Sequence, residues 1–124
     1  MIGFSELVGL LFIFPCSMLL HELMHIKSCG LFSSGSIHVD NFGLYADTEF
    51  DKFGICWYAG GVFTAIILFL TKIFTGNTPF SFALVSCGWL QLIYGILEGH
   101  FHFLSKHMRY VLYITILLFM GLIW

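Results

Sequence analysis

Three apolar segments, each long enough to cross a lipid bilayer as a helix, dominate this chain of 124 residues. They cover about residues 2–25, 53–74 and 80–104, and a shorter apolar segment covers about 109–124. A helix rises about 1.5 Å per residue, so about 20 residues cross a hydrocarbon core of about 30 Å. With 59% hydrophobic and 10% charged residues, so short a chain could not hide its apolar surface from water. We therefore predict an all-α integral membrane protein, a single domain over 1–124 with about four transmembrane helices.

The first apolar segment ends in the sequence His21-Glu22-Leu23-Met24-His25, which is a His-Glu-x-x-His motif. On a helix the two histidines lie one turn apart on one face, where both imidazoles can bind one zinc ion. Glu22 is rotated away from that face, so its carboxylate is free to act as a general base on water. Unpaired polar groups at membrane depth cost on the order of a few kcal/mol, which favours a functional site over a chance match.

A catalytic zinc ion needs a third protein ligand and an open position for water. The third apolar segment contains Glu98, its only carboxylate, at the same end as the motif if consecutive helices alternate in direction. His100 and His102 are alternative ligands from the same stretch. We favour Glu98, because a carboxylate also lowers the net charge of the bound ion. The sequence thus predicts one catalytic Zn²⁺ held by His21, His25 and Glu98.

The long polar segment at 27–52 separates the first two apolar segments. Alternating residues at 36–39, a turn at Asp40-Asn41 and a second short run at 42–45 predict a small β-hairpin-like loop, with an ordinary loop as the alternative. Such a hairpin could hold an unwound substrate by edge pairing, and Val39 is the candidate binding residue there.

The lysines and arginine predict how the chain lies in the membrane. Lys27, Lys52, Lys106 and Arg109 fall on one side, whereas Lys72 and the N-terminus fall on the other. The positive-inside rule assigns the first group to the cytoplasm. We therefore predict a multi-pass cell-membrane protein with both termini outside and the active site near the cytoplasmic face.

Three stretches together resemble the site-2 protease family of intramembrane zinc metalloproteases. The first is the motif at 21–25, which is followed by a lysine and a glycine. The second, Ala-Gly-Gly-Val-Phe-Thr at 59–64, is similar to the family's Ala-Gly-Pro segment, with Gly61 in the proline place and Thr64 in the place of an asparagine. The third, at 91–100, is similar to the family's Asn…Pro…Leu-Asp-Gly-Gly-His segment.

The resemblance implies cleavage of peptide bonds within transmembrane segments of other proteins. It puts Glu98 in the place of the family's aspartate, which is the third zinc ligand. It also implies that Gly60, Gly61 and Gln91 bind substrate. Gln91 replaces the family's asparagine and lies one residue nearer to Glu98, and the prolines that break the family's third helix are absent.

The expected partners are a transmembrane protein substrate and the lipid bilayer, with a homo-oligomer or a regulatory membrane subunit as further alternatives. The net charge of −2 and the lack of a basic run argue against nucleic acid. Two rival functions remain: a non-catalytic metal-binding subunit or pseudo-protease, and, less favoured, a di-iron membrane oxygenase. A di-iron centre needs paired Glu-x-x-His motifs and several further ligands, and the six histidines of this chain supply few.

Overall fold

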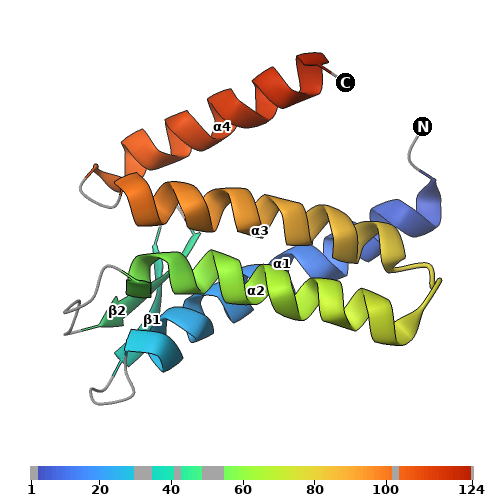
Figure 1. Cartoon of the computed structure of the whole chain (residues 1–124), viewed down its shortest axis with the longest axis horizontal. Coiled ribbons are helices and arrows are strands. Elements are labelled where there is room, and N and C mark those ends of the chain that lie inside the picture. Colours follow the sequence, from blue (N-terminus) through green and yellow to red (C-terminus); the bar gives the residue numbers. More distant parts are fainter. Residues whose placement is uncertain (1–2, 30–34, 41–42, 49–54, 102–103, 124) are drawn as a thin grey trace.

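The computed structural model describes residues 3–29, 35–40, 43–48, 55–101 and 104–123. Within these ranges, two short strands lie between the first and second of four helices (Figure 1). In chain order the elements are α1 (Phe4–Cys29), β1 (Gly35–Asp40), β2 (Gly43–Thr48), α2 (Ile55–Thr75), α3 (Ser81–Phe101) and α4 (Lys106–Ile123).

Helices α1, α2 and α3 are each long and apolar enough to cross a membrane, which confirms the predicted fold class. Helix α4 is apolar but shorter, so its crossing stays a prediction. Helix α1 continues through Pro15 and extends four residues beyond the predicted end at His25. Lys27 lies in its last turn, where a positive charge interacts favourably with the helix dipole.

Helices α2 and α3 are joined by a short connection at 76–80, in which Gly76 has a positive φ of 66°. The two helices make the most extensive contact in the bundle, and they touch backbone to backbone at Gly61 and Gly95. A methyl group at either glycine would overlap the other helix. Small residues allow this close approach of the two helices. The turns of α3 that carry Gln91 and Glu98 then face the interior of the bundle.

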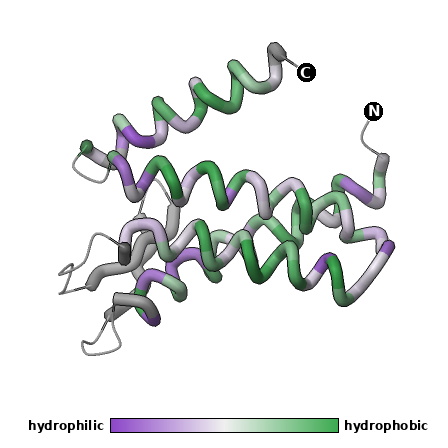
Figure 2. The backbone as a smooth tube through the Cα atoms, in the orientation of Figure 1, coloured by the Kyte–Doolittle hydropathy of each residue, from purple (hydrophilic) through white to green (hydrophobic). Residues whose placement is uncertain are grey.

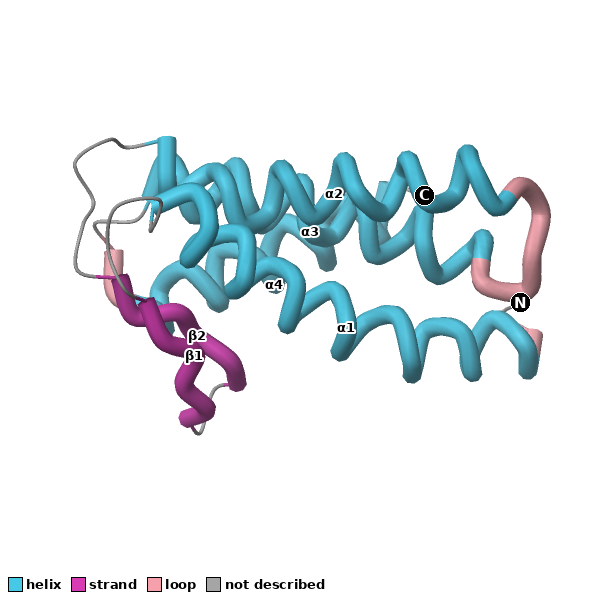
Figure 3. Tube along the Cα trace, turned by 90° about the horizontal axis from the view of Figure 1, so that it is seen from below, coloured by secondary structure: helices cyan, strands magenta, loops and turns pink. Residues whose placement is uncertain are grey.

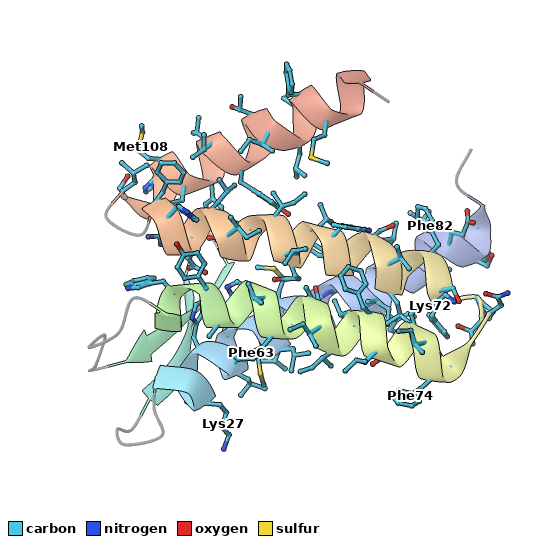
Figure 4. The ribbon with its side chains drawn as sticks, viewed as in Figure 1. Lys27, Phe63, Lys72, Phe74, Phe82 and Met108 are labelled. Atoms are coloured by element: carbon cyan, nitrogen blue, oxygen red, sulfur yellow. The ribbon has the colours of Figure 1, made fainter. Side chains whose placement is uncertain are left out.

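The outer surface of the bundle carries many large apolar side chains, and its interior holds polar side chains beside a small hydrophobic core. Hydrophobic residues follow the helices along most of their length (Figure 2). Phe63 and Phe74 project outward from α2 (Figure 4), and Phe74 is 85% exposed. In contrast, Ser17, His21 and Thr64 are almost fully buried. This arrangement suits a chain whose solvent is lipid, because polar groups are then stable only where they face one another.

Strands β1 and β2 pair antiparallel from Gly35 opposite Thr48 to Asp40 opposite Gly43. They lie at one end of the bundle, against α1 (Figure 3). The connecting residues 41–42 lie outside the described residues, so the predicted turn between the strands stays a prediction. The first described residues of α1 and the end of α4 lie at the opposite end of the bundle (Figure 1).

Candidate metal centre

The two histidines of the motif lie on the interior face of α1, one turn apart. Their ring centroids are 4.8 Å apart, and the two Nε2 atoms are 3.1 Å apart. His21 is 1% exposed and His25 is 8% exposed. Both imidazoles therefore present one nitrogen to the same small volume within the bundle.

Glu98 completes this group from α3. Its Oε2 atom lies 3.0 Å from Nε2 of His21 and 2.9 Å from Nε2 of His25. The structure thus brings together the three residues predicted as ligands, and each of them is buried. A buried group of two imidazoles and one carboxylate can hold a metal ion.

The chemistry of this donor set fits a zinc ion. Neutral imidazole nitrogens and an ionised carboxylate oxygen all carry lone pairs, so contacts of 2.9–3.1 Å between them require a cation or shared protons. Ligand atoms held about 2.0–2.1 Å from a tetrahedral zinc ion are about 3.3–3.4 Å apart. The three side chains would need to separate by only a few tenths of an ångström, and two histidines with one glutamate are a known catalytic zinc set.

Glu22 lies next to His21 in the sequence but outside the three-residue donor group. A step of about 100° along the helix turns its carboxylate away from the face that carries the two histidines. The residue is 7% exposed, so Glu22 is buried on the same helix as the two histidines. This position suits a general base, which must approach the metal without becoming a ligand.

The alternative ligand His100 is turned away from the donor group. Its Nδ1 atom lies 3.1 Å from the hydroxyl of Tyr58 on α2 and 3.0 Å from the carbonyl of Ile96. The side chain is exposed, whereas Glu98 is buried. His102, the other alternative, lies outside the described residues.

The predicted substrate-binding glycines of α2 both occupy packing positions. Gly60 lies against the imidazole of His25, and a methyl group there would overlap the ring. Gly61 forms the backbone contact with α3 described above. Val39 lies in β1 opposite Leu44. The substrate-binding roles of these three residues stay predictions.

Gln91, for which the family resemblance implied substrate binding, contacts the candidate ligand His21. Its Oε1 atom lies 2.7 Å from Nδ1 of His21, and its Nε2 atom lies 3.2 Å from Oγ of Ser17. Sequence reasoning missed Ser17. The available signal was its position four residues before His21, which places a polar group on the same helix face within an apolar run.

Tyr94 connects the centre with α4. Its ring centroid lies 5.4 Å from that of His21 and 5.0 Å from that of Tyr113 on α4. A second α4 residue, Tyr110, stacks on Tyr94 at 6.0 Å. The hydroxyl of Tyr113 in turn donates to the carbonyl of Leu90 at 3.3 Å. This aromatic cluster therefore forms the wall of the centre on the α4 side.

Thr64 is a second polar residue in the interior of the bundle. Its hydroxyl is fully buried and has no hydrogen-bond partner within the described part of the chain. Three other helical threonines, Thr71, Thr75 and Thr115, each donate to the carbonyl four residues earlier. The Thr64 hydroxyl makes no such bond, so no hydrogen bond offsets the cost of removing it from water.

Comparisons of the chain with protein-family models, curated proteins and solved structures found no match. The function is therefore inferred from the residues of the metal centre and from the membrane-like surface around them.

Proposed function

We propose that this protein is an intramembrane zinc metalloprotease, which hydrolyses peptide bonds in or near transmembrane segments of other membrane proteins. The observation that carries the proposal is the buried group of His21, His25 and Glu98, with Glu22 beside it, in a bundle whose outer surface is apolar. Three protein ligands leave the fourth position of a tetrahedral ion open, as catalytic zinc requires. A purely structural zinc site would have four protein ligands.

When bound, zinc would supply a Lewis acid that polarises a peptide carbonyl and makes a water molecule acidic near neutral pH. Glu22 would accept the proton of the attacking water and return it to the nitrogen of the leaving peptide. His21, His25 and Glu98 would hold their donor atoms in place from two different helices. Burial of all four side chains excludes bulk water and strengthens the electrostatic interactions among them.

A helical substrate must unwind before cleavage, because its peptide groups are hydrogen-bonded within the helix. Strands β1 and β2 lie at the C-terminal end of α1, which also carries the motif. An unwound segment would add to an edge of these strands by main-chain hydrogen bonds. Replacing Val39 with proline removes one amide donor from β1. It should reduce cleavage of a full-length transmembrane substrate while leaving cleavage of a short flexible peptide intact, and equal cleavage of both would contradict this part of the proposal.

We place the metal end of the bundle in the cytoplasm and both termini outside. Lys27 near the end of α1 and Arg109 near the start of α4 lie towards the metal end. Lys72 lies near the opposite end, where its Nζ is 3.3 Å from Oδ1 of Asn77. The bias of positive residues supports this orientation. A cysteine introduced at Asn77 should react with a membrane-impermeant reagent on intact cells, and labelling only after lysis would reverse the orientation.

The decisive experiment compares the full chain with its Glu22→Gln variant in lipid nanodiscs, with zinc content and cleavage of a transmembrane substrate measured on the same samples. Loss of the general base should reduce cleavage by about 10²–10⁴-fold and leave zinc bound. Unchanged cleavage with zinc bound would refute the protease assignment. Zinc binding without cleavage by the unsubstituted chain would favour the non-catalytic alternative.

The same metal analysis separates zinc from iron. The described residues contain one group of three potential ligands, whereas a di-iron centre needs a second set. Iron in the purified protein would therefore favour the oxygenase alternative and contradict the proposed hydrolysis.

A further inference from the structure

The side chain of Gln91 connects α3 to α1 through contacts on both sides of its amide group. Besides its contacts with His21 and Ser17, the Nε2 atom lies 3.6 Å from the sulfur of Met18. Gln91 is 4% exposed and Ser17 is 1% exposed. Because bulk water does not reach these groups, the partners within the bundle decide which way the amide points.

Two neighbours on α1 determine the orientation of the amide. The thioether sulfur of Met18 carries no hydrogen and can only accept, so the amide edge that faces it is the NH₂ group. The hydroxyl of Ser17 donates to the carbonyl of Phe14 at 2.7 Å, which leaves its lone pairs for the other amide hydrogen. Both amide hydrogens then have acceptors, and the amide oxygen faces His21.

The orientation of the amide in turn decides which nitrogen of His21 carries a hydrogen. An amide oxygen only accepts, so the Nδ1 atom at 2.7 Å must be the N–H donor. A neutral imidazole has one N–H group, and its Nε2 atom is then left with a lone pair. That Nε2 atom is the one that faces Glu98 and His25.

We infer that Gln91 is a positioning residue that selects the Nδ1–H tautomer of His21 and so presents Nε2 to a divalent metal ion. Ser17 and Met18 hold the Gln91 amide in the required orientation. The inference rests on the metal site of the proposed function, and it assigns to Gln91 a role in metal binding in place of substrate binding. Groups that bind the second nitrogen of a ligating histidine commonly fix its tautomer and tune its affinity for the metal.

The residues that contact His21 or orient its partner lie at regular helical spacings on α1 and α3. Ser17 and Met18 lie about one turn before His21, so the helix that carries the ligand also carries the groups that orient its partner. Gln91 and Glu98 lie two turns apart on α3, so one helix contacts both nitrogens of the His21 ring. Helix α3 packs directly against α1, so both contacts cross the same pair of helices.

The test uses the full chain in detergent micelles with two readouts that do not depend on hydrolysis. Zinc affinity is measured by competition with a chelator, and the tautomer of His21 is read from the NMR shifts of its ring nitrogens. Gln91→Met keeps the length of the side chain without the amide, and should raise the zinc dissociation constant about 10–100-fold with loss of the Nδ1–H preference. Gln91→Glu keeps an acceptor for Nδ1–H, and should not show the loss of about 10–100-fold expected of Gln91→Met.

Ser17→Ala tests the support of the amide, and should weaken zinc binding less than Gln91→Met because Met18 still accepts one amide hydrogen. It also serves as the test if Gln91→Met does not fold. The inference is wrong if Gln91→Met binds zinc as tightly as the unsubstituted chain with His21 still in the Nδ1–H form. It is equally wrong if Gln91→Glu loses zinc as strongly as Gln91→Met. Neither result bears on hydrolysis, which the Glu22→Gln variant tests separately.

Discussion

The Nε2 atom of His21 lies 3.0 Å from Oε2 of Glu98, although the two residues are 77 positions apart in the chain. One belongs to α1 and the other to α3, so the donor group depends on how these helices pack. Substitutions at the packing contacts should therefore change metal binding even when every ligand is intact.

The identity of the third ligand is tested by a pair of neighbouring substitutions on α3. Glu98→Ala removes the oxygen donor and should weaken zinc binding by more than about 100-fold, beyond the range expected for a supporting residue. His100→Ala should leave the zinc content unchanged, because His100 is bonded to Tyr58 and Ile96. Elemental analysis of both purified variants gives the answer. If His100→Ala lost zinc and Glu98→Ala kept it, His100 would be the third ligand in place of Glu98.

Gly60→Ala should weaken zinc binding without removing any ligand. The added methyl group would overlap the imidazole of His25, so the ring must rotate away from the donor group or α2 must shift. We expect a loss of about 1–3 kcal/mol in unfolding free energy, in zinc-binding free energy, or divided between them. Gly121→Ala is the matched control, because its methyl group would meet no atom within 4 Å. If the two variants had equal unfolding free energies and equal zinc affinities, Gly60 would not support His25.

Gly95→Ala should destabilise the bundle itself. The new methyl group would overlap the backbone of α2 at Gly61 and Val62, which cannot rotate aside as a side chain can. We expect the unfolding free energy to fall by about 1–3 kcal/mol, together with weaker zinc binding, because Gln91 and Glu98 move with α3. Unfolding by a denaturing detergent and zinc titration measure the two effects. A stable variant with normal zinc affinity would contradict the importance of this helix crossing.

Thr64→Val should stabilise the protein. The substitution removes a fully buried hydroxyl that has no partner in the described structure, and it nearly preserves the shape of the side chain. Leaving such a group unsatisfied costs about 1–3 kcal/mol, so we expect a gain of about that size in unfolding free energy. The control is Thr71→Val, which removes an exposed hydroxyl bonded to its own helix. A loss of stability or of zinc in Thr64→Val would mean that the hydroxyl supports the centre.

Much of the fold follows from local pattern. The apolar segments predicted α1, α2 and α3 to within a few residues, because in lipid a helix satisfies its own backbone hydrogen bonds. The largest difference is the end of α1, which continues to Cys29. The predicted end followed from the loss of apolar character after His25. A polar last turn that contains Lys27 can nevertheless extend the helix beyond its apolar segment.

By itself, the sequence determined that His21 and His25 share one helix face and that Glu22 does not, because these relations depend only on the period of the helix. It also determined which carboxylate of the third apolar segment could join them. Only the tertiary structure decided that Gln91 binds His21, that His100 turns towards Tyr58, and that Gly60 lies beside His25. Those relations depend on how α1, α2 and α3 are rotated and packed against one another. Such packing rests on contacts between residues far apart in the chain, as where Gly61 meets Gly95 and Gly60 meets His25.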